Sequence, residues 1–130
     1  MEDIKKKKLV DAWILAQEEG DDESWAIQAM IHMPDDDPEL CWELITLIHA
    51  EPISESVRAI LAASPLEDLL VYHGEEFFPH VRNLALKDPL FRKMLSEIWL
   101  DGNSSPIWRE FYELAGVKPQ FPPGWDKKKK

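Results

Sequence analysis

The sequence predicts an all-α protein: a compact bundle or short stack of about seven to eight short helices arranged as helical hairpins, for which a HEAT-like stack is one form. Apolar residues recur three and four positions apart, and no stretch alternates apolar and polar residues for long enough to form a strand. A capping residue also precedes proline repeatedly. This arrangement is expected where helices begin, because proline suits the first helical position and Asp or Ser accepts a hydrogen bond from a free amide. These pairs are Asp37-Pro38, Ser64-Pro65, Asp88-Pro89 and Ser105-Pro106.

The first two helices are expected on either side of Gly20. One covers about residues 3–19 and ends at Gly20, which can adopt the left-handed conformation of a helix C-terminus. Gln17 is the one polar residue on its apolar face. The next helix is expected to start near Glu23 and to end before Pro34, where an acidic loop follows.

The third and fourth helices are expected to start at Asp37 and Ser54, which are good capping residues. Cys41 and Ile45 widen the apolar stripe of the third helix, as is typical of a central helix that is contacted from two sides. Cys41 is the only cysteine, so an internal disulfide is excluded and a reducing compartment fits best. Because this thiol lies in an apolar stretch, we expect it to be unreactive.

A fifth helix is expected to start at Ser64 and to stop at His73-Gly74. Ser64 and Glu67 have the S-x-x-E spacing of a capping box, in which each side chain binds the backbone amide of the other residue. Asp68 would add a favourable negative charge near the start of this helix, and His73 would lie near its end.

Three further helices are expected in the remainder of the chain. Pro79 is tolerable only in the first turn of the sixth helix, Asp88 would cap the seventh, and the eighth would end at Gly116. Three tryptophans fall on or beside apolar stripes and are expected in the core. They are Trp13, Trp99 and Trp108.

Length and composition predict one helical domain over residues 1–116, followed by an irregular tail rich in proline and lysine over residues 117–130. The apolar fraction of 45% and the charged fraction of 31% are typical of a globular protein. No segment resembles a signal peptide or a membrane span. We therefore expect a cytoplasmic protein that does not bind membranes.

The net charge of −10 is concentrated in one third of the chain. Residues 20–64 contain ten acidic residues and one base, Arg58, whereas residues 65–130 contain ten of each sign. Such a surface repels the phosphates of nucleic acids and attracts basic partners. Binding to nucleic acid is therefore not expected.

The motifs of catalysis, metal binding and cofactor binding are missing from the sequence. None of the histidines at positions 32, 49, 73 and 80 pairs with another histidine or with Cys41 at ligand spacing. There is no nucleophile elbow, no phosphate-binding glycine loop and no calcium-binding loop. The sequence predicts no metal, no cofactor and no enzymatic activity.

The polar segment from Ser64 to Glu76 is the strongest alternative to that conclusion. Glu67, Asp68 and His73 could form an acid–base site, together with a group from another helix. At about 100° per residue, however, Glu67 and His73 lie roughly 240° apart around one helix, and Asp68 and His73 roughly 140° apart. The capping role described above accounts for the same residues without chemistry.

The chain resembles a family of uncharacterised bacterial proteins that is classified as a domain of unknown function. The resemblance rests on the run from Pro65 to Leu70, on His73-Gly74, and on the later pairs Asp88-Pro89, Phe91-Arg92 and Ile98-Trp99. It covers about residues 24–112. It implies a small helical bacterial protein and assigns no activity. The chain is also similar, in size and charge alone, to small acidic immunity proteins that neutralise basic toxins.

The leading hypothesis is a non-enzymatic protein-binding module that docks onto a basic partner. Two alternatives stay open: a ligand binder or enzyme centred on Glu67, Asp68 and His73, and a structural subunit of a larger assembly. Trp42 would anchor the interface if it is exposed among carboxylates, and otherwise it packs against a neighbouring helix. The residues expected to contact the partner are Asp21, Asp22, Glu23, Asp35, Asp36, Asp37, Glu39, Trp42 and Glu43.

Overall fold

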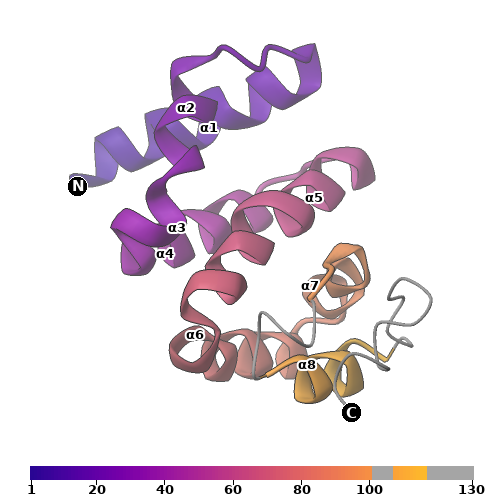
Figure 1. Ribbon diagram of the computed structural model, residues 1–130. Coiled ribbons are helices and arrows are strands. Elements are labelled where there is room, and N and C mark those ends of the chain that lie inside the picture. The colour runs from indigo at the N-terminus through magenta and orange to yellow at the C-terminus, as the bar shows by residue number, and fades with distance from the viewer. Residues whose placement is uncertain (101–106, 117–130) are drawn as a thin grey trace, which may run out of the picture.

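The computed structural model describes residues 1–100 and 107–116, and in these residues the secondary structure consists of helices joined by turns and short loops, without strands (Figure 1). This confirms the all-α prediction. The helices follow one another with short connections. Their bounds are α1 (Asp3–Glu19), α2 (Trp25–Ile31), α3 (Met33–Asp36), α4 (Pro38–His49), α5 (Glu55–Leu61), the π-helix η1 (Ala62–Leu66), α6 (Glu67–Lys87), α7 (Pro89–Met94), the 3₁₀ turn η2 (Leu95–Glu97) and α8 (Trp108–Ala115).

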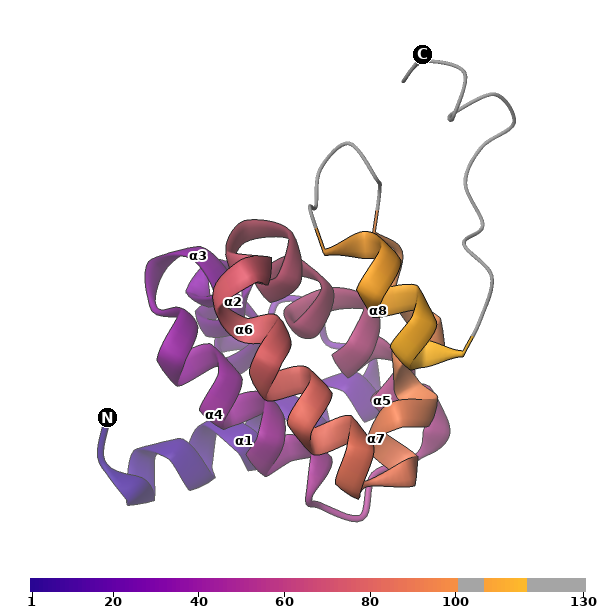
Figure 2. The same cartoon turned by 90° about the horizontal axis from the view of Figure 1, so that it is seen from below.

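The helices pack in an order that places the two ends of the described chain far apart. Helices α1 and α2 lie together at one end of the molecule, whereas α7 and α8 lie at the other (Figure 1). Between them, α6 contacts α3 and α4 on one side and α7 and α8 on the other (Figure 2). One continuous hydrophobic core includes buried residues from α1 to α8.

Several of the expected helix ends are confirmed. The side chains of Asp37, Ser54 and Asp88 each accept a hydrogen bond from a first-turn amide of α4, α5 and α7. Gly20 and Gly116 end α1 and α8 in the left-handed conformation, with φ of 70° and 73°. The fourth Pro pair, Ser105-Pro106, and residues 117–130 lie outside the described residues.

The start of a helix at Ser64-Pro65 is wrong. Helix α5 continues through the π-helix η1 into α6, and Pro65 lies inside η1. A proline ring clashes with the carbonyl four residues earlier in an α-helix, and a wider π-helical turn relieves this clash. Pro65 therefore marks an irregular helical turn here and not the beginning of a helix.

The expected stop at His73-Gly74 is partly right. The backbone of His73 leaves the helical region, with φ −136° and ψ 39°, and so divides α6 into two segments. No loop follows, because Gly74 is already helical and buried. Pro79 lies beyond the first turn of the second segment, contrary to the prediction.

The acidic segment after Pro34 was predicted to be a loop, and this is also wrong. Met33–Asp36 forms a single helical turn, α3, in which Pro34 occupies an early position that needs no amide hydrogen. The side chain that caps α2 belongs to Ser24, one residue beyond the expected start at Glu23. Helix α3 thus projects Asp35 and Asp36 from a fixed turn.

Candidate functional site

Glu67, Asp68 and His73 do not converge on one site. Glu67 Oε1 accepts a hydrogen bond of 2.5 Å from the backbone amide of Trp99, which lies in a different part of the fold. His73 Nε2 lies 3.8 Å from Asp35 Oδ1 of α3. The alternative site predicted from these three residues is therefore not assembled.

The capping box predicted for Ser64 and Glu67 is likewise absent, because the Glu67 carboxylate binds Trp99 and no cap bond is made at the start of α6. Burial raises the pKa of Glu67, and the hydrogen bond from Trp99 partly offsets this effect. Trp99 itself is 52% exposed, so its predicted place in the core is wrong. Its backbone amide makes the contact with Glu67.

Asp68 lines a hollow of about 130 Å³ where η1 and α6 meet α1 and α2. Apolar and polar side chains both line the hollow, and burial raises the pKa of the Asp68 carboxyl. Within the described residues, no hydrogen bond or ion pair is formed by the Asp68 side chain. The residues around the hollow are Trp13, Gln17, Ile27, Met30, Ile31, Ser64, Pro65 and Asp68. We call this site the Asp68 hollow.

Cys41 is buried next to this region, as predicted. Burial, together with the charges of Asp68 and Asp37, raises the pKa of the thiol to about 12. A thiol with such a pKa is protonated at neutral pH and is a poor nucleophile. The burial of Cys41 and its raised pKa both agree with the expectation of an unreactive cysteine.

Seven of the predicted partner-binding acids are exposed, and we refer to them as the acidic face. They lie in three places: before α2, in α3, and at the start of α4. Among the described residues, an ionic neighbour is recorded for Asp35 alone, namely His73. The acidic face comprises Asp21, Asp22, Glu23, Asp35, Asp36, Asp37 and Glu39.

Two other residues predicted for the partner surface are used inside the molecule. Both oxygens of Glu43 lie within 2.7 Å of Lys6 Nζ, which joins α4 to α1. Trp42 is half-buried, and its ring contacts Phe91 edge-on with a centroid distance of 6.0 Å. Glu43 is therefore not a free charge, and the packing interpretation of Trp42 is the correct one.

A buried polar network that the sequence analysis missed links α4, α5 and α7. Arg58 Nη1 lies 2.5 Å from His49 Nδ1 and donates to the His49 carbonyl at 3.0 Å. His49 Nε2 lies 2.8 Å from Asp88 Oδ2. Because Arg58 can only donate, His49 Nδ1 must be unprotonated, and the Nε2–H donates to Asp88.

This network is structural in character. His49 and Arg58 are each 8% exposed, and among the described residues no hydrogen bond joins the side chains of the three residues to a serine or cysteine side chain. The pKa of Asp88 is lowered, chiefly by the hydrogen bond from His49. The hydrogen bonds from the amides of Phe91 and Leu90 lower this pKa further. The sequence predicts Asp88 as a helix cap and contains Arg58 as the one basic residue of residues 20–64. No local sequence pattern indicates that the two residues belong to one network.

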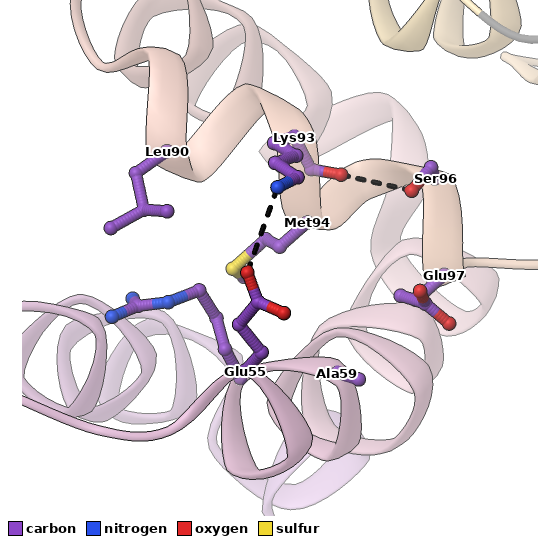
Figure 3. Close-up of a pocket in the computed structure, with 8 residues that line it drawn as sticks. Glu55, Ala59, Leu90, Lys93, Met94, Ser96 and Glu97 are labelled. Atoms are coloured by element: carbon purple, nitrogen blue, oxygen red, sulfur yellow. Dashed lines mark hydrogen bonds and ion pairs between the residues drawn. The ribbon is translucent and has the colours of Figure 1, made fainter.

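A second hollow, of about 100 Å³, lies between α5 and α7 (Figure 3). Glu55 and Lys93 face one another across it, with 3.7 Å between Oε1 and Nζ. Both side chains are largely exposed, and such an ion pair contributes little to stability. Its charges are balanced, so this hollow does not favour a charged ligand.

Within the described residues, no group of three or more His, Cys, Asp or Glu side chains is arranged to hold a metal ion. The same residues include no helix that is long and apolar enough to cross a membrane. These findings add no candidate site to the acidic face and the Asp68 hollow.

Comparison with known proteins identifies one family. The model of a family of unknown function (DUF6869) matches residues 15–115, a range that includes the acidic face and the residues of the Asp68 hollow except Trp13. No curated protein and no solved structure matches the chain. The bacterial origin implied by the resemblance stays a prediction. The match spans well over half of the sequence, and the chain therefore belongs to the family of unknown function DUF6869.

Proposed function

We propose that the protein is a non-enzymatic binding module whose acidic face engages a basic surface on a partner protein. The observation that carries this proposal is the absence, among the described residues, of any lysine or arginine paired with the acidic face. The lysine-rich segment of α1, Lys5–Lys8, is partly engaged elsewhere: Lys6 binds Glu43, and Lys7 binds Asp11.

Uncompensated charge of one sign attracts the opposite sign over about one Debye length, roughly 8–10 Å at physiological salt. It accelerates association and selects among partners more than it sets the final affinity. Asp35, Asp36 and Glu39 of the acidic face are held on α3 and α4, so these charges keep a defined spacing, whereas Asp21, Asp22 and Glu23 lie in the turn before α2. Neutralisation of a basic toxin, in the manner of an immunity protein, is one concrete form of this role.

The positions of the titratable groups favour binding over catalysis. Glu67 binds a backbone amide, and His49 is enclosed by Arg58 and Asp88. General acid–base catalysis needs such groups to meet around a substrate. Their separate structural contacts support a non-enzymatic role.

The test begins with affinity purification from the native host and identification of the basic protein recovered. The interaction is then measured with purified proteins, for the wild type and for a variant with four reversals on the acidic face: Asp21→Lys, Asp22→Lys, Asp35→Lys and Asp36→Lys. We expect at least a tenfold loss of affinity, and a marked loss for the wild type between 50 and 300 mM NaCl.

A control variant carries four reversals at exposed acids elsewhere: Glu76→Lys, Glu97→Lys, Glu110→Lys and Glu113→Lys. It has the same net charge as the test variant, so a specific role of the acidic face predicts a much smaller loss. Equal losses in the two variants, or none in the first, would show that the acidic face is not the interface.

A further inference from the structure

The Asp68 hollow is distinct from the acidic face but lies beside it. Helix α2 supplies Ile27, Met30 and Ile31 to its wall. The residues that precede and follow α2 in the chain belong to the acidic face. A basic segment held by that face would therefore pass close to the hollow.

The Asp68 carboxylate is the unusual group in this hollow. A half-buried carboxylate is normally stabilised by hydrogen bonds or by a positive charge, and within the described residues Asp68 has neither. Apolar side chains also line the hollow: Ile31 is 48% exposed, whereas Trp13 and Met30 are each 2% exposed and so almost fully buried. A ligand that combines an apolar stem with a positive end would satisfy both features.

The size of the hollow narrows the choice of ligand. Its volume of about 130 Å³ corresponds to roughly four water-sized groups at about 30 Å³ each. A lysine side chain beyond Cβ has four heavy atoms: three methylene carbons and Nζ. An arginine guanidinium is a wider, planar group that pairs best with the two parallel oxygens of one carboxylate, whereas a lysine ammonium can direct its three donors to separate acceptors.

The polar atoms around the hollow also match an ammonium group. Three of the residues that line it carry a side-chain acceptor: Asp68, Gln17 and Ser64. An ammonium group has three donors. Gln17 interrupts the apolar face of α1, and Ser64 is supplied by the π-helix η1, an irregularity that often occurs at functional sites. Three elements thus contribute one acceptor each: α1, η1 and α6.

We infer that the Asp68 hollow binds the side chain of a lysine on the basic partner, with Asp68 paired to the ammonium and the apolar lining residues beside the methylenes. This inference rests on the proposed function and makes it more specific. The acidic face attracts the positively charged surface of the partner, and the Asp68 hollow recognises one lysine on that surface.

The test uses three short peptides of equal length that differ at one central position: lysine, arginine or norleucine, each flanked by the same two lysines. Binding is followed by two-dimensional NMR of the ¹⁵N-labelled full chain, which resolves the indole N–H of Trp13 from the other tryptophans. We expect the lysine peptide to bind most tightly and to shift the Trp13 signal, and the norleucine peptide to bind at least fivefold more weakly.

Asp68→Asn should weaken the lysine peptide about tenfold and abolish the preference for lysine over arginine. The control Glu76→Gln removes the same charge at an exposed position and should change little. Ser64→Ala provides a second, smaller perturbation of the same hollow. Unchanged binding in Asp68→Asn, or a Trp13 signal that does not move with the lysine peptide, would overturn the inference.

Two further results separate the inference from the proposed function. If the acidic-face reversals weaken the binding of all three peptides equally and Asp68→Asn weakens the binding of none, the proposed function is supported and the inference about the Asp68 hollow is overturned. If Asp68→Asn abolishes binding of the lysine peptide and the acidic-face reversals do not, the inference about the Asp68 hollow is supported and the proposed role of the acidic face is overturned. Binding of free n-butylammonium as tightly as the peptide would identify a small-amine site and would contradict docking of a protein.

Discussion

Asp88 illustrates how a single carboxylate can serve both local and tertiary structure. Its Oδ1 accepts hydrogen bonds from the amides of Leu90 and Phe91, at 3.0 and 3.1 Å, and so caps α7. Its Oδ2 lies 2.8 Å from His49 Nε2, on a residue of α4. The cap fixes the side chain in place, and the fixed side chain then holds the buried histidine.

Replacement of Asp88 by alanine should destabilise the protein by about 2–3 kcal/mol. The variant loses a helix cap, which contributes roughly 1 kcal/mol, and leaves the buried Nε2–H of His49 without its acceptor, which costs about 1–3 kcal/mol. Urea denaturation measures the change. Asp88→Asn keeps an oxygen for the cap, so it should lose about half as much, and equal losses in both variants would contradict the double role.

Replacement of Asp68 should increase stability, in contrast to replacement of Asp88. Because burial raises the pKa of its carboxyl, the folded state binds this proton more tightly than the unfolded state, and the charged form at neutral pH costs stability. Asp68→Asn should therefore be slightly more stable than the wild type at pH 7, by less than about 1 kcal/mol, because the group is partly exposed and screened.

This gain should shrink as the pH falls through the raised pKa of Asp68, where the wild-type carboxyl becomes neutral as well. Thermal denaturation of both proteins at pH 7 and near pH 4 measures the difference. A variant that is less stable than the wild type at pH 7, or a gain that grows towards acid pH, would show that the carboxylate has a stabilising partner.

The helices differ in how their ends are determined. The ends of α1 and α8 depend on one glycine each, whereas the passage from α5 to α6 depends on how the helices pack around η1. Pro65 would otherwise interrupt the helix, and the π-helical turn lets the chain pass without a loop. This passage places Ser64 and Asp68 on the same hollow.

Gly20→Ala should destabilise the protein by about 1 kcal/mol. Gly20 has φ of +70°, a conformation that an L-residue adopts at a cost, and its amide hydrogen bonds close the end of α1. A Cβ placed there meets no atom within 4 Å, so the cost comes from the backbone alone. Chemical denaturation should show a smaller loss for Gly20→Asn, because asparagine tolerates this conformation better, and equal losses would point to a steric cause.

At the scale of the whole molecule, acidic residues outnumber basic residues and are unevenly distributed along the chain. The net charge is −10, and most of the excess is carried by residues 20–64, whose exposed acids surround α2 and α3. Repulsion among these groups opposes folding, and a basic partner would relieve it. The same charge that destabilises the free protein therefore supports the proposed interaction.

Salt should consequently stabilise the free protein. Raising NaCl from 20 to 300 mM shortens the Debye length from about 20 Å to about 6 Å and screens the repulsion. We expect the melting temperature to rise by about 2–5 °C, as for a gain of roughly 1 kcal/mol in a domain of this size. The four-reversal variant of the acidic face, with its net charge near zero, should show little of this rise, and an equal rise in both proteins would exclude the acidic face as its source.

The amino-acid sequence by itself determined the fold class and most helix ends. Caps such as Asp37, Ser54 and Asp88 act on amides two or three residues away, and Gly20 acts on the turn before it. These interactions are local, so they form whatever the helices pack against. The pattern of the acidic face was equally readable, because it depends only on which residues are charged and exposed.

The tertiary structure alone decided where the remaining polar groups go. Glu67 binds Trp99, which is 32 residues away, and His49 binds Asp88, which is 39 residues away. Glu43 is neutralised by Lys6 across 37 residues. Periodicity within one helix predicts which face is apolar, but not which helix will cover that face or which polar group will meet another there. For this reason the capping box of Ser64 and Glu67 was wrong, and the Asp68 hollow became visible only once the helices were packed.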